Sequence, residues 1–200
     1  MMTKLFAKTL VLVIGMLVAA TNAYPQEAVT TDEIVQALTP KPRTRSIGSG
    51  GLSSEDLAFI EIIKKKTRGI TIEERTELAV IVEKAQMPAI DLDVNFEFNS
   101  AALTADATIL LQKLGTALQV KELAGTSILL AGYTDAKGAP DYNQRLSEDR
   151  SKSVLAYLMT NFQVSSDKLV AVGYGEEGLK NPADPNASEN RRVRVVNLAK

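Results

Sequence analysis

The sequence predicts an α/β fold, a two-layer sandwich in which helices pack on a β-sheet. Residues 92–98 alternate apolar and polar side chains, which is the period of a strand. The apolar run at 128–131 is too short for a helix and is interpreted as a buried strand. Two further strand-like segments lie at 168–174 and 193–198, with Asn-, Pro- and Asp-rich chain between them. With a helix after each of the first two strands, the order is strand, helix, strand, helix, strand, strand.

The two helices of this layer have recognisable beginnings. The first is expected to be capped near Thr104 and to turn four apolar side chains inward, namely Ile109, Leu110, Leu114 and Leu118. Before the second helix, Gly138 and Pro140 break the chain, and Asp141 is placed to cap a helix that runs to about Asn161. This arrangement puts the chain just after the 128–131 strand close to the start of a long helix.

Four parts of the chain are expected. Residues 1–23 form a signal peptide, 24–52 a mostly irregular linker with a short helix near its middle, and 53–88 a pair of helices. Residues 89–200 form the α/β domain, which we expect to fold alone. In the helical pair, Ser53 or Ser54 can cap the first helix, and the second opens with a capping box from Thr71 to Glu74 and ends before Pro88. The three lysines at 64–66 suit the negative end of the first helix and a solvated face.

The first residues are typical of a secretory signal. Lys4 and Lys8 precede an apolar core of eleven residues, Leu10 to Ala20, and cleavage is expected after Ala23. The apolar core is shorter than the roughly 20 residues that a membrane-spanning helix needs, so no transmembrane segment is expected in the mature chain. The mature protein is therefore expected to be soluble and exported.

Composition narrows the classes of function. The net charge is −1, and −3 once the two signal lysines are removed, so the sequence offers no basic surface for nucleic acid. Cysteine and histidine are both absent, which excludes disulfides, Ser-His or Cys-His nucleophile pairs and imidazole metal sites. We expect no metal, no cofactor and no enzymatic activity. The neighbouring Glu176 and Glu177 do not change this, because adjacent carboxylates point apart and a glycosidase needs two that face one bond.

The region between the second strand and the second helix concentrates candidate binding residues. Asp135 lies just past the strand, and Asn143 and Arg150 are two helical turns apart, on the same side of the helix. Arg150 falls on the apolar stripe of Leu146, Val154 and Leu158, so it requires an anionic partner. That partner is either a ligand or Asp135 itself, in a purely structural pair.

These residues also carry a resemblance. Residues 89–200 resemble the OmpA C-terminal-like family, the peptidoglycan-binding module of outer-membrane proteins, Pal lipoproteins and motor stators. The matching segments, in the family's order and spacing, are Phe96-Glu97-Phe98-Asn99-Ser100-Ala101, Gly132-Tyr133-Thr134-Asp135, Tyr142-Asn143-Gln144-Arg145-Leu146-Ser147, Arg150, Gly173-Tyr174-Gly175-Glu176 and Asn190-Arg191-Arg192-Val193.

The resemblance implies an α/β sandwich that binds the diaminopimelate of the peptidoglycan peptide stem. It implies that Asp135 takes the ligand ammonium and Arg150 its carboxylate, with Asn143, Asn99 and Arg191 nearby. The chemistry agrees, because a zwitterion needs one anion and one cation, and the planar guanidinium matches a carboxylate in two parallel hydrogen bonds. Two departures stand out: Tyr133 replaces the histidine that the family often has, and the 185–189 loop lacks its usual glycine-arginine.

Three functions are compared on this basis. The first is a non-catalytic module that tethers the envelope to the wall, in the periplasm and close to the outer membrane. The second is an envelope structural or interaction protein in which residues 24–88 bind a protein partner and wall binding is incidental. The third, a peptidoglycan hydrolase, lacks histidine, cysteine and a facing carboxylate pair. Intact Asp135 and Arg150 favour the first.

Overall fold

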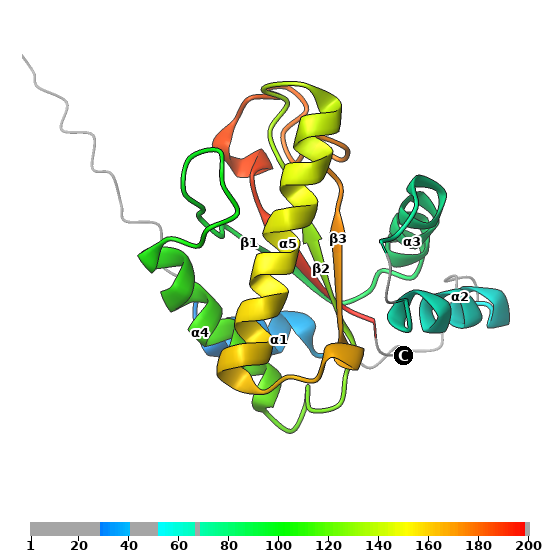
Figure 1. Cartoon of the computed structure of the whole chain (residues 1–200). Coiled ribbons are helices and arrows are strands. Elements are labelled where there is room, and N and C mark those ends of the chain that lie inside the picture. The colour runs from blue at the N-terminus through cyan, green and yellow to red at the C-terminus, as the bar shows by residue number, and fades with distance from the viewer. Residues whose placement is uncertain (1–28, 41–51, 67–68, 199–200) are drawn as a thin grey trace, which may run out of the picture.

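The computed structural model describes residues 29–40, 52–66 and 69–198. Among them lie five α-helices, four strands and two short 3₁₀ turns (Figure 1), whose bounds are α1 Thr31–Leu38, α2 Ser54–Lys64, α3 Ile72–Lys84, β1 Ala89–Leu92, α4 Ala105–Gln119, β2 Ile128–Gly132, α5 Pro140–Phe162, η1 Ser166–Lys168, β3 Leu169–Gly173, η2 Ser188–Asn190 and β4 Val193–Asn197. The predicted α/β class and the order of strands and helices in the domain are confirmed. No helix in these described segments has the length and hydrophobicity to cross a membrane. The predicted signal peptide lies outside them.

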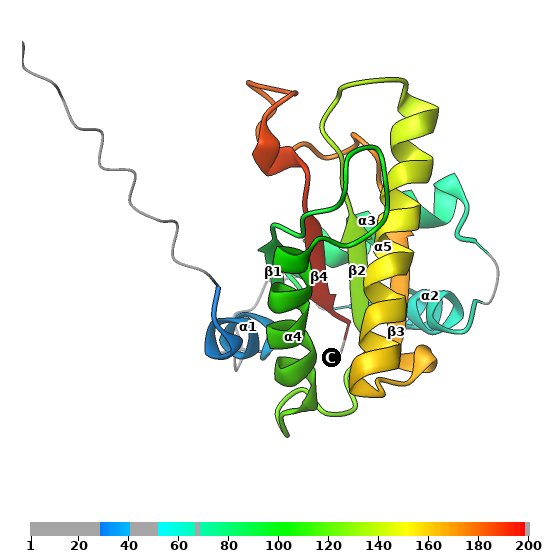
Figure 2. The same cartoon turned by 60° about the vertical axis from the view of Figure 1, so that its left-hand side comes forward.

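The four strands form one sheet in the order β1-β4-β2-β3. Strand β4 is antiparallel to both of its neighbours, and β2 and β3 are parallel, joined by the α5 crossover. Helices α4 and α5 cover one face of the sheet (Figure 2). Strand β3 forms one edge, and β2 is buried throughout its length.

Capping explains where most helices begin. Ser53 caps α2 and Thr71 caps α3, each in a capping box, and Thr104 caps α4 through the Ala107 N–H, as the sequence predicts. The prediction that Asp141 caps α5 is wrong. The N-cap is Ala139, which makes no side-chain hydrogen bond, and Pro140 occupies the first turn, where its missing N–H costs nothing.

Two predicted side-chain placements differ in the structure. The predicted bounds of the first strand, 92–98, are wrong, because β1 spans Ala89–Leu92 and ends where Leu92 pairs with Val193, the first residue of β4. The inward period holds at Leu92, Val94 and the partly buried Phe96, but not at Phe98, which is 92% exposed. In α4, Ile109 is 54% exposed and not inward, because the buried stripe runs through Ala107, Leu111, Leu114 and Leu118.

The region before residue 89 is more closely joined to the sheet than the sequence indicates. Residues 24–52 are expected to be mostly irregular, yet α1 buries Ile34 and Leu38 completely in the core beneath α4. The side chain of Asn197 in β4 donates to the Leu38 carbonyl at 2.9 Å. Helix α1 is therefore part of the folded core.

The helical pair covers the opposite face of the sheet (Figure 1). Its buried side chains, Ile60, Ile63, Leu78, Ile81 and Val82, pack with Leu129, Ala131, Val170, Val172 and Val196 of the strands. This region precedes the predicted two-layer sandwich as expected, and it adds a helical layer on the second face of the same sheet.

Candidate functional site

The predicted site residues converge at the carboxyl end of β2 and the start of α5. The chain leaves β2 at Gly132, and the Thr134 N–H donates to the Gly175 carbonyl at 2.7 Å, which joins this loop to the turn after β3. Asp135 follows and is buried, with 7% of its surface exposed. Its Oδ1 accepts from the Lys137 N–H at 3.2 Å, which fixes the side chain within its own loop.

Arg191 supplies the cation that faces Asp135. Its Nη1 lies 2.7 Å from Asp135 Oδ2, and its side chain is 45% exposed, so the pair is open to solvent on one side. The preceding residue, Asn190, is fully buried and holds the 181–190 loop through its side-chain amide. The Ala136 N–H donates to the Pro185 carbonyl, which anchors this loop beside Asp135.

Asn143 lies in the first turn of α5 and is 2% exposed. Its Nδ2 donates to the Asp135 carbonyl at 3.3 Å and to Glu176 Oε2 at 2.7 Å. Asn143 therefore orders the Asp135 loop from below and fixes a second carboxylate, that of Glu176. From the sequence, Glu176 is expected only as a carboxylate unsuited to glycosidase chemistry, and its bond to Asn143 is not predicted.

Arg150 lies two turns further along α5 and does not pair with Asp135. Its Nε donates to the Ser100 carbonyl at 3.1 Å, and its guanidinium carbon lies 4.9 Å from the centre of the Phe96 ring. The described residues give it no ion pair, so the structural pair of Asp135 with Arg150 is not what forms. The two Nη groups of Arg150 remain without a carboxylate among these residues.

Electrostatics around Arg150 agree with this placement. Burial lowers the pKa of its guanidinium, and the positive charge of Arg191 adds to the effect, while Tyr142 and Asp135 oppose it. Arginine keeps its charge in proteins regardless. Arg150, Arg191 and Asp135 thus share one electrostatic environment that contains two cations and one anion, a composition suited to a carboxylate.

Asn99 is the least integrated of the predicted residues. It sits in a left-handed conformation, with φ of 49°, beside Phe98, which is 92% exposed. Its side chain forms no hydrogen bond with any described residue. The loop is nevertheless brought to the site, because Ser100 accepts from Arg150 and Phe96 lies under the guanidinium. Phe96 was missed as a site residue because an aromatic in an alternating segment is expected in the core.

Tyr133 is held away from Asp135. Its ring stacks on Tyr174 with centroids 5.2 Å apart, and the Arg192 guanidinium lies 4.1 Å above it. Burial raises the pKa of the Tyr133 hydroxyl. Tyr133 is therefore a packing residue with no titration near neutral pH.

Comparison with known proteins agrees with the sequence motifs. A sequence model of the OmpA family matches residues 95–195. Outer membrane protein A of Serratia marcescens is 43% identical over 84 residues, which are 42% of this chain and 23% of that protein. The Shigella flexneri protein of the same name is 34% identical over 127 residues, 60% of this chain and 35% of that protein. The chain therefore spans well under two thirds of these relatives.

Solved structures of the same type are also similar. The peptidoglycan-associated lipoprotein of Burkholderia pseudomallei is 29% identical with a TM-score of 0.43, covering 52% of this chain and 86% of that one. The C-terminal domain of Helicobacter pylori MotB is 22% identical with a TM-score of 0.48, covering 56% and 86%. Because the family model covers half of the sequence, including Asp135, Asn143, Arg150 and Arg191, this chain belongs to the OmpA family.

Proposed function

We propose that the protein is a non-catalytic module that binds peptidoglycan through the diaminopimelate of its peptide stem and tethers the envelope to the wall. This proposal rests mainly on the orientation of the Arg150 guanidinium and on its lack of an anionic partner among the described residues. Its guanidinium is oriented by Ser100 and Phe96, and the described residues leave its Nη groups without an anion. A half-buried arginine that is held in one orientation, and whose two Nη groups have no anion among the described residues, is suited to a ligand carboxylate.

Asp135 completes the recognition of a zwitterion. An ionised carboxylate has about four lone-pair positions, and the described contacts of Asp135 use one from Lys137 and one from Arg191. Capacity remains for a ligand ammonium. Arg191, 45% exposed, can move toward the ligand carboxylate as the ammonium arrives, so that two cations and one anion face one carboxylate and one ammonium.

Non-catalytic binding is also favoured by the carboxylates near the site. Glu176 is bonded to Asn143 of α5, whereas Glu177 is bonded at 3.0 Å to Arg75 of α3, so the two side chains diverge to different elements. A glycosidase requires two carboxyl groups that face one bond. Within the described residues no group of three potential metal ligands comes together.

The proteins to which this chain is similar include an outer membrane protein A and a peptidoglycan-associated lipoprotein. Together with the signal-like residues 1–23, this supports a periplasmic location at the outer membrane and wall. In the alternative, in which residues 24–88 bind an envelope protein, the inner faces of α1, α2 and α3 do not take part, because they are buried on the domain.

Co-sedimentation with purified sacculi tests the proposal. The protein should sediment with diaminopimelate-type sacculi and not with walls whose stem carries lysine, because lysine lacks the second carboxylate that Arg150 is proposed to hold. Equal binding to both wall types would contradict the diaminopimelate assignment. Release of muropeptides that depends on Glu176 or Glu177 would contradict the non-catalytic assignment.

A further inference from the structure

Strand β3 leaves one edge of the sheet unpaired. In the sheet order it is the last strand, and its only strand partner in the described chain is β2. The Tyr174 N–H donates to Gly132 of β2, so residues 170 and 172 also face β2 while Leu169, Ala171 and Gly173 face outward. The Gly173 carbonyl is taken by Gln144, but the N–H and C=O of Ala171 have no partner among the described residues.

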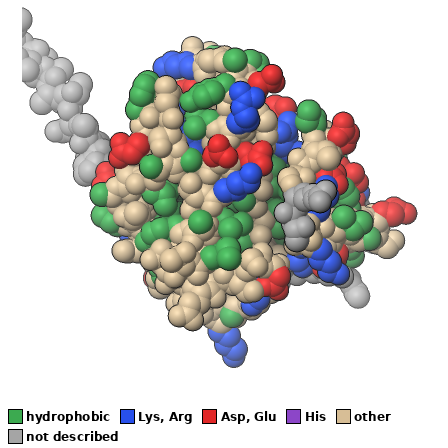
Figure 3. All heavy atoms as spheres, viewed as in Figure 1, with side chains coloured by type: hydrophobic (Ala, Val, Ile, Leu, Met, Phe, Trp, Pro, Cys, Tyr) green, Lys and Arg blue, Asp and Glu red, His purple; other side chains and the backbone are tan. Residues whose placement is uncertain are grey.

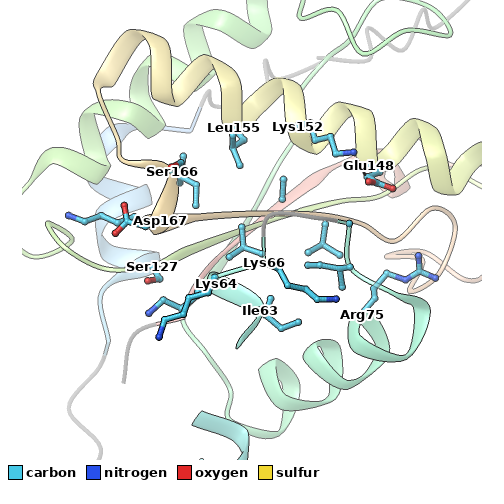
Figure 4. Close-up of a pocket in the computed structure, with 18 of the residues that line it drawn as sticks. Ile63, Lys64, Lys66, Arg75, Ser127, Glu148, Lys152, Leu155, Ser166 and Asp167 are labelled. Carbon is cyan, nitrogen blue, oxygen red and sulfur yellow. Dashed lines mark hydrogen bonds and ion pairs between the residues drawn. The ribbon is translucent and has the colours of Figure 1, made fainter. Parts of the chain in front are cut away.

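A groove of about 870 Å³ runs along this edge. Figure 4 shows β3 crossing it, with Glu148, Lys152 and Leu155 of α5 on one side and Ile63, Lys64 and Lys66 on the other. The walls approach each other at the Gly173 end, where a Cβ placed on Gly69 would lie 3.9 Å from Glu148. Five strand residues span about 16 Å, a length that suits an extended peptide.

The lining of the groove is basic although the chain is not. Its charged lining comprises three acidic side chains, Glu61, Glu148 and Asp167, and six basic ones, Lys64, Lys65, Lys66, Arg75, Lys152 and Lys168. Four of the six basic side chains form ion pairs: Lys64 with Glu61, Lys66 with Glu74, Arg75 with Glu177 and Lys152 with Glu148. Lys65 and Lys168 form no ion pair with the described residues. The whole chain has a net charge of −1, so this excess of basic side chains is local. On the face shown in Figure 3 acidic and basic side chains are interspersed.

Arg75 adds an unsatisfied donor. It is 5% exposed and lies at one end of the groove (Figure 4). Its Nη2 bonds Glu177 at 3.0 Å and its Nη1 reaches the Gly173 carbonyl at 3.4 Å, but its buried Nε has no hydrogen-bond partner in the described structure. A buried guanidinium N–H without an acceptor is costly, so an acceptor supplied by a ligand would be favourable there.

We propose that this groove binds an extended acidic peptide segment of a partner protein, which adds as a strand to β3. The free backbone groups of Ala171 supply the main-chain pairing, and the lysines supply charge complementarity to alternate acidic side chains. A second copy of this chain is the less suitable occupant, because joining two β3 edges would bring two sets of lysines together.

The test uses a fluorescein-labelled six-residue peptide in which glutamate alternates with valine, and fluorescence anisotropy with protein spanning residues 24–200. Ala171→Pro removes the outward N–H and blocks the edge, and the fold should tolerate it because this N–H has no partner among the described residues. Lys65→Glu/Lys168→Glu reverses two unpaired charges. Lys121→Glu, an exposed lysine outside the groove, is the matched control.

We expect the peptide to bind, and both the proline variant and the double charge reversal to weaken it at least tenfold, with no change in Lys121→Glu. A peptide with N-methylated backbone should not bind. Absence of peptide binding, binding that Ala171→Pro leaves intact, or equal loss in Lys121→Glu would each overturn the proposal. So would a dimer in analytical ultracentrifugation that the proline variant abolishes, since a second copy would then occupy the edge. Sacculus binding should persist in all variants, which separates this surface from the wall-binding site.

Discussion

Replacement of Arg150 by alanine should remove wall binding and leave the fold in place. The described contacts that stabilise this side chain are one hydrogen bond to the Ser100 carbonyl and the ring of Phe96 beneath the guanidinium. A hydrogen bond of this kind contributes about 0.5–1.5 kcal/mol and a partly exposed cation–π contact about 0.5–1 kcal/mol. The free energy of unfolding should therefore fall by about 1–2.5 kcal/mol, a decrease in Tm of ~2–10 °C for a chain of this size.

The effect on binding should be larger. Loss of hydrogen bonds to a charged ligand group costs about 2–4 kcal/mol, or ~30- to 700-fold in Kd. Arg150→Lys keeps the charge but loses the planar fork, so its Kd should lie between those of the wild type and the alanine variant. Arg145→Ala is the matched control, because Arg145 is exposed on the same helix and the described residues give it no ion pair.

The assay is isothermal titration of a soluble diaminopimelate-containing muropeptide, with a thermal melt of each variant. If Arg150→Ala binds the muropeptide with an unchanged Kd, the proposed role of the Arg150 guanidinium in ligand binding is refuted. A Tm decrease well beyond 10 °C would mean that Arg150 is a structural residue, because removal of one partner from a buried ion pair costs about 3–5 kcal/mol.

Three other expectations follow from the packing and the titration of the site. Gly173→Ala should strongly destabilise the fold in a thermal melt, because the added Cβ would lie 2.3 Å from the backbone nitrogen of Glu148 in α5. Leu38→Ala should lower the free energy of unfolding by about 2–5 kcal/mol, since this side chain is fully buried. A fragment of residues 89–200, which is expected to fold alone, should bind a hydrophobic dye on the sheet face that α2 and α3 cover in the full chain. Muropeptide affinity should be constant from pH 6 to 8, because the chain has no histidine and burial raises the pKa of Tyr133 further from this range; a tenfold change would contradict the assignment of the site.

The sequence predicts the elements of this fold because their signals are local. Thr71 and Thr104 cap their helices through bonds that span three residues, and such bonds need no tertiary structure. The placement of α1 could not be predicted in this way. Ile34 and Leu38 are only two large apolar residues in a polar segment, and their burial depends on α4 and β4, which come much later in the chain.

The site shows the same limit in its charges. Chemistry and family motifs indicate that Asp135 and an arginine belong together, and the sequence offers two arginines for that position. Geometry decides between them. Asn190 holds its loop so that Arg191 reaches Asp135 at 2.7 Å, whereas Arg150 is drawn to Ser100 and Phe96. The Arg191–Asp135 ion pair and the unpaired Nη groups of Arg150 therefore depend on the conformation of the loops, which the spacing of residues along the chain does not predict.

The turn after β3 connects the wall-binding site to the helical pair. Arg75 of α3 donates hydrogen bonds to the Gly173 carbonyl and to Glu177. The residue before Glu177, Glu176, accepts a hydrogen bond from Asn143 beneath the Asp135 loop. Only two residues separate the strand end that Arg75 contacts from the carboxylate that Asn143 fixes. Helix α3 therefore contacts, through Arg75, the short hydrogen-bonded segment that leads from the end of β3 to Glu176, and it supports the position of Asn143 beneath the Asp135 loop.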